Sequence, residues 1–200
     1  MDKIVEIVRR GGVARIKLLS GEVLRAPSPL FLERRVRTGE EIDAEAYRAF
    51  LRQRGYPHAM EAAGKFLMLR ERSEQEVRQR LRRSCYDEDT IERVIAALFQ
   101  HSLISDARFA QQWVARQARK YGRGRIAQEL KMKGVDGEEA RRALEDLTEE
   151  EELGRALSQA RKMVRRFQGN PQKIAQALIR RGYNWSMAKK AAEEAVAEEE

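Results

Sequence analysis

The chain has 200 residues, a formal net charge of +8 and a pI of about 9.8, which favours anionic partners without by itself identifying nucleic acid. Charged residues make up 36% and aromatic residues 6%, which suits thin helical layers better than one thick core. One cysteine excludes an internal disulfide, and no stretch reaches the ~20 apolar residues that cross a bilayer, so we expect a soluble cytoplasmic protein without membrane contact.

Residues 1–43 differ from the rest of the chain because they predict short β-strands. Their apolar runs are separated by turn sequences at residues 11–12 and 20–22, which is typical of a hairpin-like segment. A hairpin alone is only marginally stable in water, so it either packs against the next segment or stays mobile. Residues 26–29 break the pattern, and residues 30–38 fit a short helix or an extended segment.

The remainder of the chain predicts helices almost throughout. Asp43 is a suitable N-cap for a connecting helix within residues 44–61, and the sequence Gly55-Tyr56-Pro57 is expected to interrupt it. Ser73 and Glu76 form a capping box at the start of a later helix. The further helices are expected near 58–71, 74–84, 88–101, 106–120, 125–133, 137–147, 149–167, 171–181 and 186–197.

Three segments of this helical region align with one another. The alignment keeps its register through a helix, its stop and the following helix, which is more specific than a match of two amphipathic helices. We therefore predict a mainly α protein with three-helix repeats at 62–105, 106–147 and 148–200 that stack into an elongated array. The aligned positions are Val77, Ile126 and Ile174, then Leu81, Leu130 and Leu178, then Cys85, Gly134 and Gly182 at the helix stop.

The sequence contains no catalytic constellation, and we expect neither a metal nor a cofactor. The two histidines, His58 and His101, lack nearby ligands at metal-binding spacing. Cys85 lies near two arginines that would activate its thiol to some degree, although a structural role is the stronger interpretation. The glycines between residues 122 and 124 lack the lysine and serine of a phosphate-binding loop, which excludes nucleotide binding of that type.

Basic residues crowd the start of the helix expected near Gly124. The helix dipole disfavours cations there, so either an anion docks among them at an exposed N-terminus, or the segment is a solvated basic turn. The acidic run at residues 149–152 lies in a first helical turn, which accounts for it without a further role. The candidate basic patch consists of Arg119, Lys120, Arg123, Arg125, Lys131, Lys133, Arg161, Lys162, Arg165, Arg166, Arg180 and Arg181.

Several motifs in this order resemble the RecX family of recombinase regulators. They are Arg72-Ser73-x-x-Glu76 with Leu81, then Leu103-Ile104-Ser105-Asp106-x-x-Phe109-Ala110, Gly122 to Gly124, and Ile126-x-x-Glu129-Leu130-x-x-Lys133-Gly134-Val135. The resemblance implies tandem three-helix repeats in a curved, elongated monomer. It also implies binding in the groove of a RecA–single-stranded DNA filament, with inhibition of strand exchange, ATP hydrolysis and coprotease activity. Cys85 departs from the glycine usual at its position, and only part of the family has the N-terminal segment.

Two functions follow as hypotheses. The first is a non-enzymatic regulator that binds a RecA-type recombinase filament and thereby modulates homologous recombination and the SOS response, with single-stranded DNA as a further partner. The second is a basic helical-repeat protein that competes for single- or double-stranded DNA through the same surface. The second predicts binding to bare DNA with a steep dependence on salt.

Overall fold

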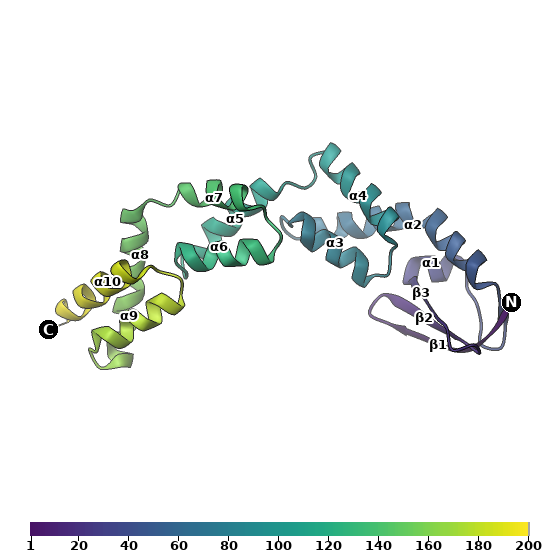
Figure 1. Cartoon of the computed structure of the whole chain (residues 1–200), viewed down its shortest axis with the longest axis horizontal. Coiled ribbons are helices and arrows are strands. Elements are labelled where there is room, and N and C mark those ends of the chain that lie inside the picture. Colours follow the sequence, from purple (N-terminus) through teal and green to yellow (C-terminus); the bar gives the residue numbers. More distant parts are fainter. Residues whose placement is uncertain (200) are drawn as a thin grey trace. The chain divides into compact units, whose positions relative to one another are not determined.

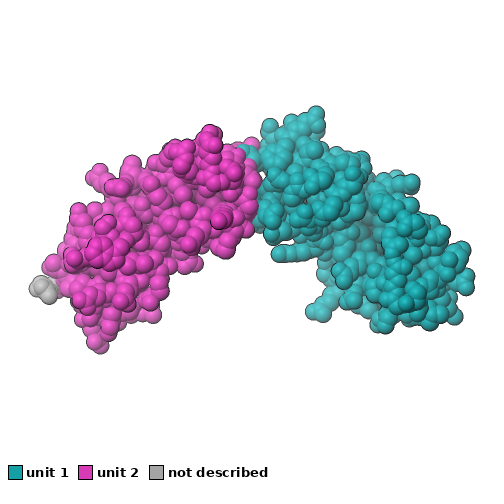
Figure 2. Space-filling model, viewed as in Figure 1, with its two compact units in different colours: residues 1–105 teal, residues 106–200 magenta. Residues whose placement is uncertain are grey.

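The computed structural model describes residues 1–199 and shows a mainly helical protein with one small antiparallel sheet. The chain divides into two compact units at Ser105, one formed by residues 1–105 and the other by residues 106–200 (Figure 2). Among residues 1–199, none of the helices combines the length and the apolar character that a bilayer crossing requires. The predicted fold class, helical three-helix repeats with a hairpin-like N-terminal segment, is confirmed.

The first unit begins with a sheet of four strands in the order β3-β2-β1-β4, all antiparallel (Figure 1). Both expected turns are present, and Gly12 and Gly21 adopt the positive φ angles of 83° and 92° that such turns require. A short fourth strand was not expected from the sequence. The strands are β1 (Asp2–Arg10), β2 (Val13–Leu18), β3 (Val23–Pro27) and β4 (Glu41–Ile42).

The sheet packs against the segment that follows it, which decides between the two alternatives left open by the sequence. Residues after β3 form the short helix α1 (Ser28–Glu33), and the long helix α2 (Ala44–Leu67) starts after β4. Tyr47 of α2 is fully buried in one cluster with the inner side chains of the sheet. This cluster supplies the apolar cover that an isolated hairpin lacks.

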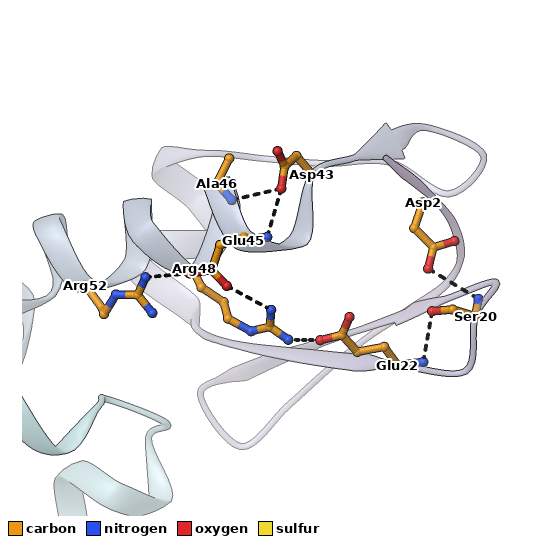
Figure 3. Close-up of polar contacts among 8 residues, drawn as sticks. All are labelled: Asp2, Ser20, Glu22, Asp43, Glu45, Ala46, Arg48 and Arg52. Atoms are coloured by element: carbon orange, nitrogen blue, oxygen red, sulfur yellow. Dashed lines mark hydrogen bonds and ion pairs between the residues drawn. The ribbon is translucent and has the colours of Figure 1, made fainter.

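Polar contacts join the start of α2 to the sheet (Figure 3). The Asp43 carboxylate caps the helix by accepting hydrogen bonds from the backbone N–H groups of Glu45 and Ala46, at 2.9 and 3.1 Å, as the sequence predicted. One helical turn later, Arg48 forms ion pairs with both Glu45 and Glu22, the latter in the turn before β3. The Arg48–Glu22 ion pair therefore connects the start of α2 to the turn before β3.

The predicted interruption of the helix at residues 55–57 is wrong, because α2 is continuous through Gly55 and Pro57. Gly55 is buried against α4 (Glu88–Gln100), where a Cβ atom would lie 3.1 Å from Thr90 Oγ1. The glycine therefore permits close packing of two helices instead of marking a turn. Tertiary contacts of this kind offset the hydrogen bond that a proline removes from a helix interior.

The helix α3 (Glu74–Arg83) completes the first three-helix group together with α2 and α4. Its predicted cap is confirmed, since the Ser73 hydroxyl accepts a hydrogen bond from the Glu76 N–H at 3.2 Å. Helices α5, α6 and α7 form a second group, and α8, α9 and α10 a third, both within residues 106–200. Their bounds are α5 (Asp106–Gln117), α6 (Arg123–Met132), α7 (Gly137–Glu145), α8 (Glu149–Arg161), the 3-10 turn η1 (Arg165–Phe167), α9 (Pro171–Arg180) and α10 (Trp185–Ala197).

The aligned positions have the same environment in all three groups. Leu81, Leu130 and Leu178 are fully buried, as are the residues four positions before each of them. The residue four positions after each leucine has a positive φ angle, and the next residue donates its N–H to the leucine carbonyl at 3.1–3.3 Å, which is the Schellman arrangement. The repeat predicted from the sequence therefore extends to backbone geometry.

Cys85 is the single non-glycine residue at this stop in the three groups, with a φ of 63°. A left-handed conformation costs a residue with a side chain about 1–2 kcal/mol, and glycine avoids this cost. Glycine also makes the unfolded chain more flexible, which offsets part of the benefit. We therefore expect Cys85→Gly to raise the free energy of unfolding by roughly 0.5 kcal/mol. Urea denaturation measures the change, with Cys85→Ala as the control that retains the strain. A Cys85→Gly protein less stable than Cys85→Ala would contradict this account.

Candidate anion-binding groove

The turn between α9 and α10 docks on the N-terminal end of α6. The Gly122 N–H donates to the Arg181 carbonyl at 2.9 Å, and the Gly124 N–H donates to the Gly182 carbonyl at 3.1 Å. A Cβ atom on Gly122 would lie 2.5 Å from both the Gly182 oxygen and the Tyr183 nitrogen. The glycines of this segment therefore allow two backbones to approach each other, a role that spacing alone did not reveal.

The third group also supplies an anion to the same helix end. Glu152, in the first turn of α8, is 6% exposed, and its Oε1 accepts a hydrogen bond from the Arg123 N–H at 2.8 Å. Its Oε2 lies 3.6 Å from Arg123 Nε, and the Arg123 guanidinium donates to the Leu147 carbonyl. The carboxylate stabilises the positive end of the α6 dipole.

This arrangement corrects two expectations from the sequence. The N-terminus of α6 is not exposed, because Glu152 and the Arg181 and Gly182 carbonyls already occupy it. The acidic run before residue 153 has a structural role beyond its own helix, since one of its members crosses to α6. The sequence did contain an indication of this contact. A helix that starts with unfavourable basic residues needs an anion, and a run of carboxylates follows later in the chain.

The docking of these elements gathers part of the predicted patch into one groove of about 660 Å³, entirely within residues 106–200. It runs from the end of α5 to the η1 turn and the end of α9, and none of its lining residues is acidic. We call it the basic groove. Its cations are Arg119, Lys120, Arg125, Lys162, Arg166, Arg180 and Arg181.

Two of these cations are held in place by neighbours. Arg125 lies over the Tyr121 ring, 4.0 Å from its centroid, and its Nε is 3.2 Å from a carboxylate oxygen of Glu129. Arg181 donates to the side-chain oxygen of Gln159 at 2.5 Å, while the Gln159 amide donates to the Arg119 carbonyl at 3.0 Å. These contacts fix the floor of the basic groove between α6, α8 and α9.

Five cations of the basic groove have no carboxylate within ion-pair distance among residues 1–199, and all five are exposed. Uncompensated positive charges that converge on one concave surface create a potential that attracts and concentrates anions. The groove also contains two partly buried aromatic rings, Tyr121 and Phe167. The five are Arg119, Lys120, Lys162, Arg166 and Arg180.

The other five members of the predicted patch lie outside the basic groove. Lys133 packs over the Trp113 ring at 4.2 Å, and Arg161 forms an ion pair with Glu198 at 2.6 Å. Arg123 takes part in the helix contact described above. Lys131 lines an adjoining cavity of about 1260 Å³ beside α6, which shares Arg125 and Arg180 with the basic groove. Arg165 lies on the exposed surface of η1.

The cysteine and the two histidines have structural neighbours. Partial burial raises the pKa of the Cys85 thiol, and Arg82 is engaged by Glu88 at 2.8 Å, which favours the structural interpretation of this cysteine. His58 lies 3.0 Å from Glu33, and His101 is the C-cap of α4. Within residues 1–199, no three side chains of the metal-binding types form a group that would hold an ion.

Two family models match this chain. The model described as "RecX, first three-helix domain" matches residues 59–98, and the model described as "RecX, second three-helix domain" matches residues 105–144. The first match covers part of α2, all of α3 and most of α4. The second covers α5, α6 and nearly all of α7, which includes the start of the basic groove.

Relatives and solved structures extend the similarity. A "Regulatory protein RecX" from Mycolicibacterium smegmatis is 37% identical over 135 residues, which span 62% of this chain and 72% of that protein. One from Clostridium perfringens is 25% identical over 195 residues and 92% of each chain. A crystal structure of regulatory protein RecX aligns with a TM-score of 0.64 over 94% of this chain and 97% of that chain, and one from Lactobacillus salivarius has the same TM-score over 70% and 96%.

Proposed function

The chain belongs to the RecX family of regulatory proteins, and we propose that it binds the filament of a RecA-type recombinase on single-stranded DNA and inhibits that recombinase. The inhibited activities are strand exchange, ATP hydrolysis and coprotease function, through which the protein modulates homologous recombination and the SOS response. It acts as a cytoplasmic monomer and catalyses no reaction of its own.

The basic groove is the observation that supports this proposal. Seven cations and no acid line it, and five of the cations are exposed and lack a carboxylate partner in the described part of the chain. A nucleoprotein filament presents phosphates in a regular line, and each neutralised phosphate releases counterions, which favours binding. The groove is accordingly our candidate for the contact with the DNA or with acidic side chains of the filament.

The proposal predicts that Arg119, Lys162 and Arg166 are needed for inhibition. A variant with R119Q, K162Q and R166Q should require at least about tenfold more protein to inhibit recombinase ATP hydrolysis on single-stranded DNA, since each lost phosphate contact weakens binding at physiological salt. These side chains are exposed and support no hydrogen bond in residues 1–199, so the variant should keep its helical content and melting temperature.

The matched control removes the same charge from exposed positions elsewhere. Arg83, Arg142 and Lys190 are exposed and lie outside the basic groove. The variant R83Q/R142Q/K190Q should inhibit like the original chain. An equal loss of inhibition in both variants would mean that net charge alone determines inhibition. Unchanged inhibition by the R119Q/K162Q/R166Q variant would exclude the basic groove as the contact with the filament.

The alternative is a plain DNA-binding protein that competes for the strand, and the same groove would serve it. A titration distinguishes the two. Inhibition of recombinase ATP hydrolysis well below one protein per recombinase subunit, and below the level that coats bare DNA, would support a regulator that acts on the filament. Inhibition only at levels that saturate bare DNA would support competition for the strand.

A further inference from the structure

The N-terminal sheet has one buried and one uncovered face. Side chains that alternate along β2 and β3 point inward at Ala14, Ile16, Leu18 and Leu24, each at most 3% exposed. Helices α1 and α2 pack on that side (Figure 1). On the other side of these strands Arg15, Lys17, Val23 and Arg25 are exposed, and we call this side of the sheet the outer face.

The outer face carries cations at its centre. On the middle strand β2, Arg15 and Lys17 are two residues apart, about 6.6 Å along the strand. The register places Arg15 directly opposite Arg25 on β3, and opposite Val8 on β1. Arg10 adds a fourth cation at the end of β1.

Intramolecular partners do not explain these charges. Glu6 is the one acid on the outer face, opposite Lys17, and no ion pair joins them in the described structure. Arg25 also lines a cavity of about 300 Å³ whose single carboxylate, that of Asp87, is hydrogen-bonded to Thr90. Like charges directly opposite in an antiparallel pair are unfavourable, so the Arg15–Arg25 pair destabilises the sheet in the absence of a bound anion.

We propose that the outer face binds the phosphate backbone of nucleic acid, as a second anion-binding surface separate from the basic groove. Phosphates placed over Arg15, Lys17 and Arg25 neutralise the cross-strand repulsion and release condensed counterions. The outer face and the basic groove lie in different units of the chain.

The composition of the outer face favours nucleic acid over an acidic protein. The centres of protein interfaces are depleted in charged residues and enriched in aromatic residues and methionine, whereas the centre of this face is charged and contains neither. Its exposed valines, Val8 at 44% and Val23 at 38%, lie on β1 and β3 with the cationic strand β2 between them, so they form no contiguous apolar patch. Without an aromatic platform for base stacking, binding should be independent of sequence.

The test compares binding of an oligothymidylate strand, measured by fluorescence anisotropy over a range of salt concentrations. The full chain with R15Q, K17Q and R25Q should bind at least about tenfold more weakly than the original chain at physiological salt. Its log–log salt slope should fall by roughly 2, since each lost phosphate contact on a single strand contributes about 0.7. The control R83Q/R142Q/K190Q should keep the original affinity and slope.

A second variant separates loss of charge from loss of structure. Because R15K/K17R/R25K preserves every charge, it should bind like the original chain, and melting curves should show that both variants fold. If R15Q/K17Q/R25Q bound the oligonucleotide as tightly as the control R83Q/R142Q/K190Q, the inference would be overturned. If R15Q/K17Q/R25Q bound polyglutamate more weakly than the original chain but bound the oligonucleotide equally well, the inference would be overturned in favour of an acidic protein partner.

Binding of a bare oligonucleotide is measured without recombinase, so it does not depend on the proposed regulatory function. If the original chain inhibits recombinase but R15Q/K17Q/R25Q binds DNA normally, the proposed function stands and the outer face is excluded as a DNA site. If R15Q/K17Q/R25Q binds DNA more weakly but the original chain does not inhibit recombinase, the outer face stands as a DNA site and the proposed function is excluded.

Discussion

Replacing Gly122 by alanine is expected to lower the free energy of unfolding of residues 106–200 by about 3 kcal/mol, since the added methyl group forces two packed backbones apart. The new Cβ atom would lie 2.5 Å from the Gly182 oxygen and the Tyr183 nitrogen, which belong to backbone and cannot rotate away. Separation also breaks the hydrogen bonds from Gly122 and Gly124 to the α9–α10 turn, each contributing about 1 kcal/mol. Urea denaturation followed by circular dichroism measures the loss.

Gly154→Ala is the matched control in the same unit. This glycine lies within α8, and no neighbouring atom lies within 4 Å of the place that a Cβ atom would take, so alanine meets no obstacle. Because alanine is the better helix former, the control should gain up to about 1 kcal/mol. A Gly122→Ala protein as stable as the original chain would show that the close approach of α6 to the α9–α10 turn is absent in solution.

Leu130→Ala is expected to lower the free energy of unfolding by about 2–5 kcal/mol through the lost apolar contacts and the cavity left behind. Leu130 is fully buried in the cluster that joins α5, α6 and α7. Its carbonyl also closes α6 by accepting the Val135 N–H at 3.1 Å, a backbone contact that the substitution leaves in place. The loss, measured by urea denaturation, should therefore report side-chain packing alone.

The control for that measurement is Met132→Ala, two residues further along the same helix. Met132 is 74% exposed, so its truncation should change the free energy of unfolding by less than about 0.5 kcal/mol. Equal effects of the two substitutions, or a cost below about 1 kcal/mol for Leu130→Ala, would mean that α6 does not bury the face assigned to it.

The N-terminal region shows where inference from local sequence was insufficient. Gly55 and Pro57 are strong turn residues, yet α2 continues through them because α4 packs against the glycine. The apolar runs and turn residues of the N-terminal segment did predict strands, but not that α1 and α2 cover one face of the sheet. Which side of a strand is covered depends on residues distant in the chain, and periodicity does not contain that information.

The sequence by itself determined the helical repeat, its buried leucines and its left-handed stops, because apolar periodicity and capping are properties of short segments. Only the tertiary structure decided which cations share a surface. Arg123 and Arg125 are two residues apart, yet the packing of α6 directs one toward Glu152 and the other into the basic groove, since side chains separated by two residues on a helix do not share a face.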